Sequence, residues 1–222
     1  MTGSTPESAT TLLVVAKQPV PGRVKTRLVP PYTHDQAAAL AEAALTDTLH
    51  TVLRVPARRR VLVLDGRPGP WLPRGFDIMP QCGGPLDERL AAAFAAVPGP
   101  ALLIGMDTPQ VTPDLLAVDW QTADAVFGPA ADGGFWALGL RVPDPALLRG
   151  VPMSTPDTGA IQLARLLTAG LRVANLPRLR DVDTAADAVA VARQAPLTRF
   201  AARAREYAGV LNEAGHVLEE TA

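Results

Sequence analysis

Cationic side chains are concentrated in one short segment near the start of the chain, directly after an apolar run at residues 12–16. They are Lys17, Arg23, Lys25 and Arg27. The apolar run has the pattern of a buried β-strand, and in open α/β sheets ligands bind outside the carboxyl ends of the strands. We therefore interpret the loop as a binding site for the phosphates of a nucleotide. The alternative is a solvated basic loop, because Lys and Arg side chains are mostly exposed in proteins.

The backbone of this loop contains residues with special conformations. Pro19 and Pro21 fix φ and stiffen the loop, whereas Gly22 permits a tight bend or the close approach of a ligand. We therefore include Gly22 with the four cations among the predicted phosphate-binding residues.

A single carboxylate follows another apolar run, at residues 101–105. Asp107 stands two positions after Gly105 and two before Pro109. A carboxylate is costly to bury without a partner, and Mg²⁺ is usually held by one or two carboxylates together with substrate phosphates. Because the basic loop is expected at the same edge of the sheet, we predict that Asp107 is a metal ligand. Capping of the following turn is the alternative.

A second acidic candidate is Asp132, which precedes Gly133 and Gly134. Asp132 could be a second metal ligand, could hydrogen-bond a sugar hydroxyl, or could act as a base on an acceptor. The two glycines would leave room for a ligand near the backbone. A simple turn explains the same three residues equally well.

Further aspartates precede a predicted helix near the end of the domain. Asp181 and Asp183 come before Thr184 and Asp187, whose spacing is that of a capping box. This local explanation is sufficient, and a metal-binding role for Asp183 is the alternative that we keep.

The elements that must position these side chains follow a regular order. Apolar runs predict strands near residues 12–16, 60–65, 76–80, 101–105, 124–128, 135–140 and 171–176. Strands and helices alternate up to residue 128, which is the pattern of a parallel core, and the apolar run 101–105 predicts a central strand. Too few residues separate the strands at 124–128 and 135–140 for a helical crossover, so we predict a mixed sheet.

Helices are predicted between these strands and at the end of the chain. They cover residues 34–54 after a capping box at Thr33, a stretch from about 86 to 97, a short helix from 113 capped by Thr112, 158–169, 184–193 and 196–218. We expect a disordered N-terminus at 1–10, one α/β domain at 11–194 and a C-terminal helical tail at 195–222. The predicted fold class is a single-domain, three-layer α/β/α sandwich with a Rossmann-like mixed sheet.

The composition limits the classes of function. The 222 residues are 48% hydrophobic and 19% charged, which indicates a globular protein, and a formal net charge of −1 argues against nucleic-acid binding. Cys82 is the only cysteine, so we expect no intramolecular disulfide and a cytoplasmic location. The histidines show no zinc spacing, and no stretch has the length of a signal peptide or membrane span, so we expect neither zinc nor a membrane partner.

Four motifs in this order carry a resemblance to a known family. They are Lys17-x-Pro19-x-x-Gly22-x-x-Lys25-Thr26-Arg27-Leu28, Gly105-x-Asp107-x-Pro109, Gly128-Pro129-x-x-Asp132-Gly133-Gly134-Phe135 and Asp181-Val182-Asp183-Thr184. The set resembles a bacterial family of small transferases with the glycosyltransferase A-type (nucleotide-diphospho-sugar transferase) fold, some of them linked to radical-SAM or arsenosugar gene contexts. The resemblance covers residues 11–194. The fold is also similar to that of small nucleotidyltransferases of cofactor biosynthesis.

The resemblance implies that Lys25 and Arg27 contact phosphates and that Asp107 holds Mg²⁺ or Mn²⁺. Two departures stand out. Prolines replace most of the glycine that forms the phosphate-binding loop of nucleotidyltransferases, and Asp107 is not part of the Asp-x-Asp motif of many glycosyltransferases. The second metal ligand must then come from elsewhere or be absent, and Asp132 is our candidate.

Three functions follow from this reading. The first is metal-dependent glycosyl transfer from a nucleotide sugar to a small-molecule acceptor, with Lys25 neutralising the departing diphosphate and Asp132 deprotonating the acceptor. The alternative is a nucleotidyltransferase that joins a nucleoside monophosphate, taken from a nucleoside triphosphate, to a phosphorylated small molecule. A third reading is a non-catalytic nucleotide-binding protein. The sequence predicts no oligomeric state.

Overall fold

The structure is a computed structural model that describes the backbone of residues 10–219 and the side chains of residues 10–209. The segment 1–10 that we expected to be disordered therefore lies almost wholly outside the described residues. Seven strands form one sheet in the order β3-β2-β1-β4-β6-β5-β7. The strands are β1 (Thr11–Lys17), β2 (Arg59–Asp65), β3 (Asp77–Pro80), β4 (Ala101–Gly105), β5 (Ala125–Pro129), β6 (Phe135–Leu140) and β7 (Val173–Asn175).

The sheet is mixed, as predicted. β1 pairs in parallel with β2 and β4, β2 pairs in parallel with β3, and β5 pairs in parallel with β7. β6 runs antiparallel to both of its neighbours, β4 and β5. The start of β6 therefore lies at the same edge of the sheet as the ends of β1 and β4. The apolar strand β4 occupies the predicted central position.

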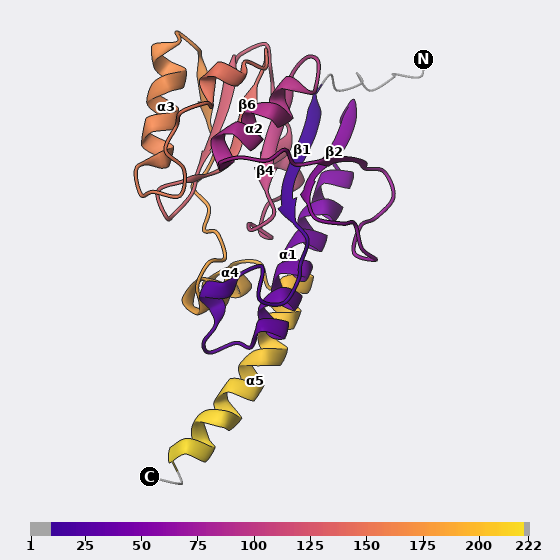
Figure 1. Ribbon diagram of the computed structural model, residues 1–222, viewed down its shortest axis with the longest axis vertical. Helices are drawn as coiled ribbons and strands as arrows, with labels where there is room; N and C mark the ends of the chain where they lie inside the picture. Colours follow the sequence, from indigo (N-terminus) through magenta and orange to yellow (C-terminus); the bar gives the residue numbers. More distant parts are fainter. Residues whose placement is uncertain (1–9, 220–222) are drawn as a thin grey trace.

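Helices alternate with the strands and extend the C-terminal part (Figure 1). The α-helices are α1 (His34–Leu53), α2 (Leu86–Ala95), α3 (Thr158–Thr168), α4 (Ala185–Gln194) and α5 (Arg199–Glu219), and the short 3₁₀ helices are η1 (Thr26–Leu28), η2 (Pro113–Leu116) and η3 (Pro145–Leu147). The predicted capping boxes at Thr33 and Thr184 are both present. Thr112 makes no side-chain cap at η2, so that part of the prediction was wrong.

Alternating side chains of the strands face two separate cores. On β1, Leu12 and Val14 pack in the core that contains Leu45 and Leu49 of α1. Leu13 faces the opposite core, where it joins the cluster that contains Phe94 of α2. Side chains two positions apart share a face of a strand, so the helices cover both faces of the sheet and give the predicted three layers.

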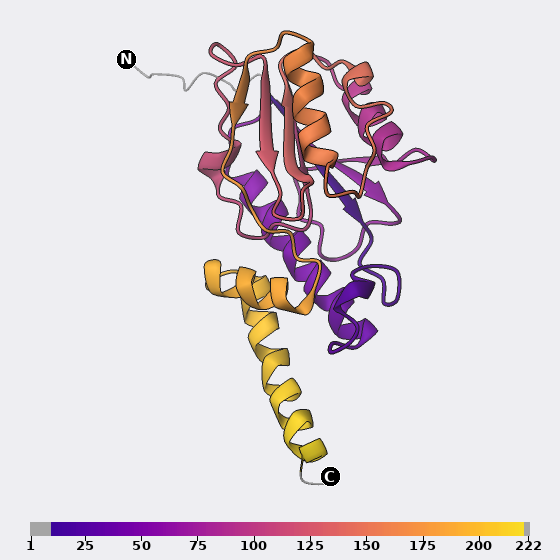
Figure 2. The same cartoon turned by 90° about the vertical axis from the view of Figure 1, so that its left-hand side faces the viewer.

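The C-terminal helices dock on α1 in a third cluster. Phe200 of α5 is fully buried there together with Leu28 and Leu40. The buried carboxylate of Asp47 accepts hydrogen bonds from the backbone N–H groups of Arg199 and Phe200, at 3.1 and 2.8 Å, and so begins α5. Figures 1 and 2 show that α5 then runs away from the sheet. In the described part of the chain, no helix combines the length and apolar character needed to cross a bilayer.

Candidate functional site

A cleft of about 520 Å³ opens at the carboxyl ends of β1 and β4. The loop after β1, the end of β4, the turn between β5 and β6 and the segment before α4 all contribute side chains to it. This size is in the range of small-molecule sites, and this position is the usual ligand site of α/β sheets.

The structure brings most of the predicted site residues together in this cleft. Those lining it are Lys17, Arg23, Lys25, Arg27, Asp107 and Asp132. Gly22 does not line the cleft; it lies in a tight turn with φ of 74°, in which the Arg23 N–H donates to the Val20 carbonyl. The glycine therefore serves the bend of the loop, and the roles predicted for the other six residues remain predictions.

The Lys25 ammonium group is held between two carboxylates. Its Nζ atom lies 2.9 Å from Asp107 Oδ1 and 2.9 Å from Asp183 Oδ1, and the Lys25 side chain is only 10% exposed. Burial lowers the pKa of Lys25, but the charges of Asp107 and Asp183 outweigh burial and raise this pKa above its usual value. Lys25 therefore stays protonated and links the first loop to segments that are remote in the sequence.

The acidic segment before α4 is fixed to the end of β4. The Val182 N–H donates to the Asp107 carbonyl at 3.0 Å, and the Gln110 side-chain amide donates to the Arg180 carbonyl at 2.7 Å. The capping box of Thr184 and Asp187 then sets the direction of α4. These bonds place Asp183 opposite Lys25 and make the segment part of the site rather than only a helix cap.

Asp181, which we interpreted from the sequence only as part of a helix start, also lines this cleft. Its Oδ1 atom is buried and has no hydrogen-bond partner among the described residues. Burial, together with the negative charges of Asp107 and Asp132, raises the pKa of Asp181 to about 7. One signal was available: Asp181 and Asp183 flank the buried Val182, and alternate residues of an extended segment face the same side.

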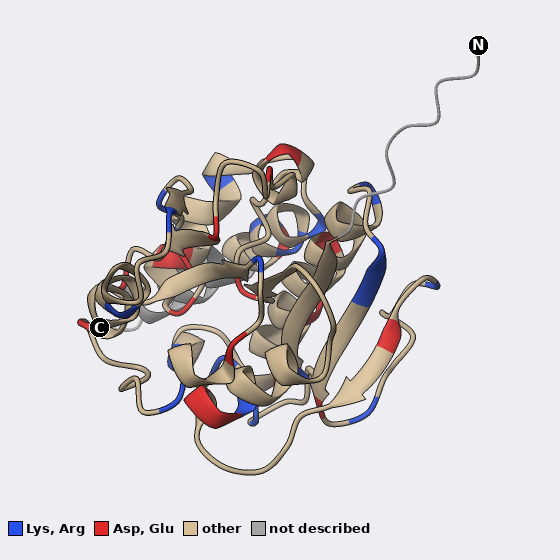
Figure 3. Cartoon of the chain, turned by 90° about the horizontal axis from the view of Figure 1, so that it is seen from above, with Lys and Arg blue, Asp and Glu red and all other residues tan. Residues whose placement is uncertain are grey.

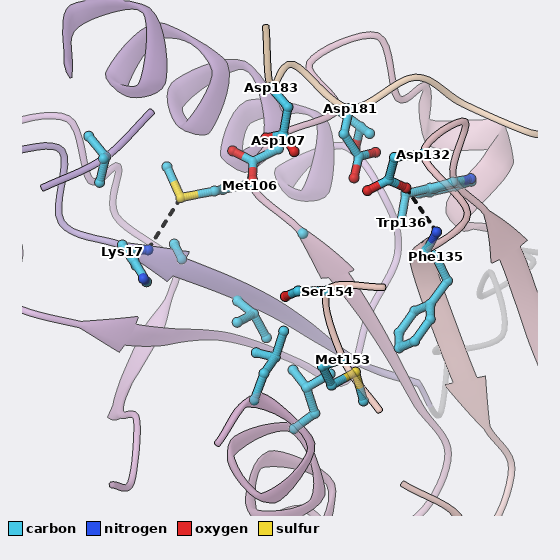
Figure 4. Close-up of a pocket in the computed structure, with 18 of the residues that line it drawn as sticks. Lys17, Met106, Asp107, Asp132, Phe135, Trp136, Met153, Ser154, Asp181 and Asp183 are labelled. Atoms are coloured by element: carbon cyan, nitrogen blue, oxygen red, sulfur yellow. Dashed lines mark hydrogen bonds between the residues drawn. The ribbon is translucent and has the colours of Figure 1, made fainter. Parts of the chain in front are cut away.

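Asp132 takes part in a turn, which was the alternative explanation for this residue in the sequence. Its Oδ1 atom accepts from the Gly134 N–H at 2.9 Å, and the residue is exposed. A Cβ atom on Gly133 would lie 2.0 Å from the Pro156 carbonyl oxygen, so this glycine permits close packing of two backbones. Figure 4 shows the carboxylates of Asp132 and Asp181 pointing toward one another on the same side of the cleft.

The opposite end of the cleft is apolar. Its lining includes Leu86 and Leu90 of α2, Phe135 at the start of β6, and Met153. Figure 4 shows Phe135 and Met153 on the side of the cleft away from Asp107 and Asp183. Trp136 is buried, as expected of a core residue, and its indole N–H donates to the Pro177 carbonyl at 3.0 Å.

The aspartates provide oxygen atoms of the kind that Mg²⁺ and Mn²⁺ prefer. Within the described residues, no group of three or more His, Cys, Asp or Glu side chains is arranged to hold a metal ion. Two carboxylates and the phosphates of a bound nucleotide form a sufficient set for Mg²⁺, and the unpartnered Oδ1 of Asp181 has a lone pair for such a cation. The donor set fits a metal that binds together with its substrate.

A comparison with protein families identifies the chain. The model of a family described as "Uncharacterized protein conserved in bacteria (DUF2064)" matches residues 39–155. The chain belongs to the DUF2064 family. A separate search of curated proteins gives no match.

Solved structures share the fold of this DUF2064 protein. A proposed nucleotide-diphospho-sugar transferase from Desulfovibrio desulfuricans G20 is 27% identical, with a TM-score of 0.82, over 92% of this chain and 97% of that one. The 2-C-methyl-D-erythritol 4-phosphate cytidylyltransferase from Thermus thermophilus is 18% identical, with a TM-score of 0.52, over 86% and 100%. A CMP:2-keto-3-deoxy-manno-octonic acid synthetase complexed with CTP is 13% identical, with a TM-score of 0.52, over 83% and 97%.

These likenesses confirm the predicted fold class, that of the nucleotide-diphospho-sugar transferases. They also support the prediction that the protein is a transferase, because each of these relatives is named as one or as a synthetase of the same fold.

Proposed function

We propose that this DUF2064 protein transfers a glycosyl group from a nucleotide-diphospho sugar to a small-molecule acceptor, with Mg²⁺ or Mn²⁺ as cofactor. One observation carries the proposal: the cationic loop after β1 and the aspartates after β4 and before α4 line one cleft. The similarity to the D. desulfuricans protein extends over almost the whole of both chains and favours a nucleotide sugar as the donor.

The phosphates of the donor are assigned to the exposed cations of the loop. Lys17 and Arg23 are exposed, line the cleft and have no carboxylate partner among the described residues. Arg27 is 75% exposed, and its Nη1 atom lies 3.4 Å from Asp183, so its guanidinium can turn to a ligand at little cost. We assign Lys25 a second role beside the predicted phosphate contact, because its ammonium group lies 2.9 Å from the carboxylates of both Asp107 and Asp183 and would hold them in place.

Asp107 and Asp181 are the carboxylates that we assign to the metal. Asp181 suits this role better than Asp132, because its buried Oδ1 has no partner, whereas Oδ1 of Asp132 already accepts from Gly134. A divalent cation at this place would neutralise the charge that develops on the departing diphosphate. It would also relieve the repulsion that raises the pKa of Asp181.

Asp132 is assigned the role of base. It is exposed at the cleft, and its second carboxylate oxygen is not engaged by the turn. An acceptor hydroxyl would give its proton to Asp132 while its oxygen bonds to the anomeric carbon of the sugar, and the bond from that carbon to the diphosphate breaks. The diphosphate then leaves with the electron pair and is stabilised by the cations of the loop.

Nucleotidyl transfer is the competing reaction for the same cleft, and the fold shared with the cytidylyltransferase and with the synthetase complexed with CTP is compatible with it. The loop after β1 argues against it, since Pro19 and Pro21 lack backbone N–H groups and Gly22 lies outside the cleft.

A thermal-shift screen separates the candidates. It would compare nucleoside diphosphates, nucleoside triphosphates and nucleotide sugars, each with and without Mg²⁺, on the natural protein and on Arg23→Met. Arg193→Met is the matched control, because Arg193 is exposed on α4 and does not line the cleft. We expect Mg²⁺-dependent stabilisation by diphosphates and nucleotide sugars, reduced in Arg23→Met only. Stabilisation by triphosphates alone would instead support nucleotidyl transfer.

A further inference from the structure

Arg89 on α2 also lines the cleft and, like Lys17 and Arg23, has no carboxylate partner among the described residues. Its Nη1 atom donates to the side-chain oxygen of Gln81 at 2.9 Å. This acceptor is a neutral amide and carries no counter-charge. The Nε atom of Arg89 is buried and has no acceptor in the part of the chain that the structure describes. Arg89 therefore carries a positive charge that the surrounding protein leaves uncompensated.

The acidic residues beside Arg89 in the sequence are already engaged elsewhere. The Asp87 carboxylate accepts from the Gly150 N–H at 2.7 Å, and the Glu88 carboxylate lies 3.0 Å from Nε of Arg149. Both contacts tie α2 to the segment that follows η3. Because these contacts engage both carboxylates, neither is available to Arg89.

Gln81 holds the Arg89 guanidinium in a defined place. The side-chain nitrogen of Gln81 donates to the carbonyls of Ala16, at 2.9 Å, and Val63, at 3.1 Å. These two bonds fix the amide group at the ends of β1 and β2 and leave its oxygen facing Arg89. A rigid neutral amide positions the guanidinium without neutralising it.

Apolar side chains of the cleft lie next to Arg89 along α2. Leu86 and Leu90 line the same cleft as Arg89 and belong to one apolar cluster with Phe135 and Met153. A charged group in apolar surroundings is costly unless a counter-charge reaches it. Nucleobases are uncharged and could offer Arg89 a hydrogen bond but no counter-charge.

We propose that Arg89 binds an anionic group of the acceptor, so that the acceptor is an acid with an apolar body. A carboxylate or a phosphate would contact the guanidinium by a charge-assisted hydrogen bond, and the apolar body would pack against Phe135 and Met153. The inference rests on the proposed function, which assigns the donor to the end of the cleft that contains the aspartates. The apolar end is then left for the acceptor.

Two methionines at opposite ends of the cleft allow each substrate to be followed separately. Met106 lies by the loop after β1, where its sulfur accepts from the Lys17 N–H at 3.2 Å, and Met153 lies at the apolar end (Figure 4). Methyl NMR of methionine-labelled protein would record both signals. The probes are UDP with Mg²⁺ for the donor, and phenyl phosphate, phenylacetate and the neutral phenylacetamide for the acceptor.

We expect UDP to shift the Met106 signal, and phenylacetate or phenyl phosphate to shift that of Met153, with the amide binding at least about tenfold more weakly. Arg89→Met should weaken binding of the acids by a similar factor and leave UDP binding unchanged, which also shows that the variant is folded. Arg89→Lys should retain part of the acid binding, and Arg193→Met all of it. The comparison of the two acids identifies which anion the site prefers.

Acid binding that is equal in Arg89→Met would overturn the proposal, as would an acid that shifts Met106 but not Met153. A large loss of UDP affinity in Arg89→Met would also overturn it, because Arg89 would then bind the nucleotide. If UDP and the other nucleotides shift neither methionine, the proposed function fails, whereas the response of Met153 to the acids tests Arg89 independently.

Discussion

Two cations of the cleft, Lys25 and Arg89, are held in opposite ways, one at each end. At one end, the Lys25 ammonium lies 2.9 Å from each of two carboxylates. At the other, the acceptor of Arg89 within the described residues is the neutral side-chain oxygen of Gln81, and apolar residues line the cleft beside it. The first charge is used within the protein to hold the site together, while the second is available to a ligand. A substitution of Lys25 should therefore lower the stability of the protein, whereas a substitution of Arg89 should weaken the binding of a ligand.

The largest effect is expected for Lys25→Met. This change leaves Asp107 and Asp183 without the cation between them, close to the further charge of Asp181. Because the two carboxylates are about one-third exposed, we expect the free energy of unfolding to fall by about 3 kcal/mol, at the lower limit for a broken buried pair. Urea unfolding near neutral pH would measure it.

Arg193→Met, on the surface of α4, is the control for Lys25→Met and should change the unfolding free energy by less than about 0.5 kcal/mol. A loss below about 1 kcal/mol in Lys25→Met would contradict a structural role for its charge.

An intermediate effect is expected for Asp181→Asn, and it depends on pH. The pKa of Asp181 is about 7 in the folded protein against 3.8 as the ordinary value, so the folded state holds this proton more tightly than the unfolded state. The unfolding free energy therefore decreases as the pH rises from about 4 to about 7, and the penalty is complete above pH 7. The full shift corresponds to about 4 kcal/mol. Because Asp181 is only partly buried, we expect Asp181→Asn to be more stable than the natural protein by about half of this, about 2 kcal/mol, near pH 8 and equally stable near pH 3.

Denaturation of both proteins across this pH range would test the effect, with the exposed Asp114→Asn as control. A stability difference that does not depend on pH would mean that Asp181 does not carry the proton.

The smallest effect on stability is expected for Arg89→Met. Methionine keeps much of the apolar volume, and the change removes a charge that has no carboxylate partner. The unfolding free energy should change by less than about 1 kcal/mol, in either direction. A loss comparable to that of Lys25→Met would remove the contrast between the two cations.

Local signals made much of the fold predictable from the sequence. The strands follow apolar runs, and the capping boxes at Thr33 and Thr184 depend on residues only three positions apart. The mixed sheet followed from the short connection between β5 and β6. The cap predicted at Thr112 failed, because its side chain does not reach the backbone of η2.

The site was less predictable, because it depends on contacts that are distant in the sequence. The loop residue Lys25 and the aspartates at positions 107 and 183 are each visible as charges, but their pairing arises only when the segment before α4 returns to the end of β4. The burial of Asp181 and the isolation of Arg89 likewise follow from how Val182 and Glu88 are held. Figure 3 shows Lys and Arg interspersed with Asp and Glu around the molecule, so charge alone does not mark the site.

The central claim is that a nucleotide is bound jointly by the loop after β1 and by a metal on Asp107. Isothermal titration calorimetry of UDP, with and without Mg²⁺, on the natural protein and on Asp107→Ala tests it most directly. We predict binding that requires Mg²⁺ in the natural protein and is lost in Asp107→Ala, while circular dichroism shows that the variant remains folded. Equal UDP affinity in both proteins, or affinity that does not respond to Mg²⁺, would contradict the account.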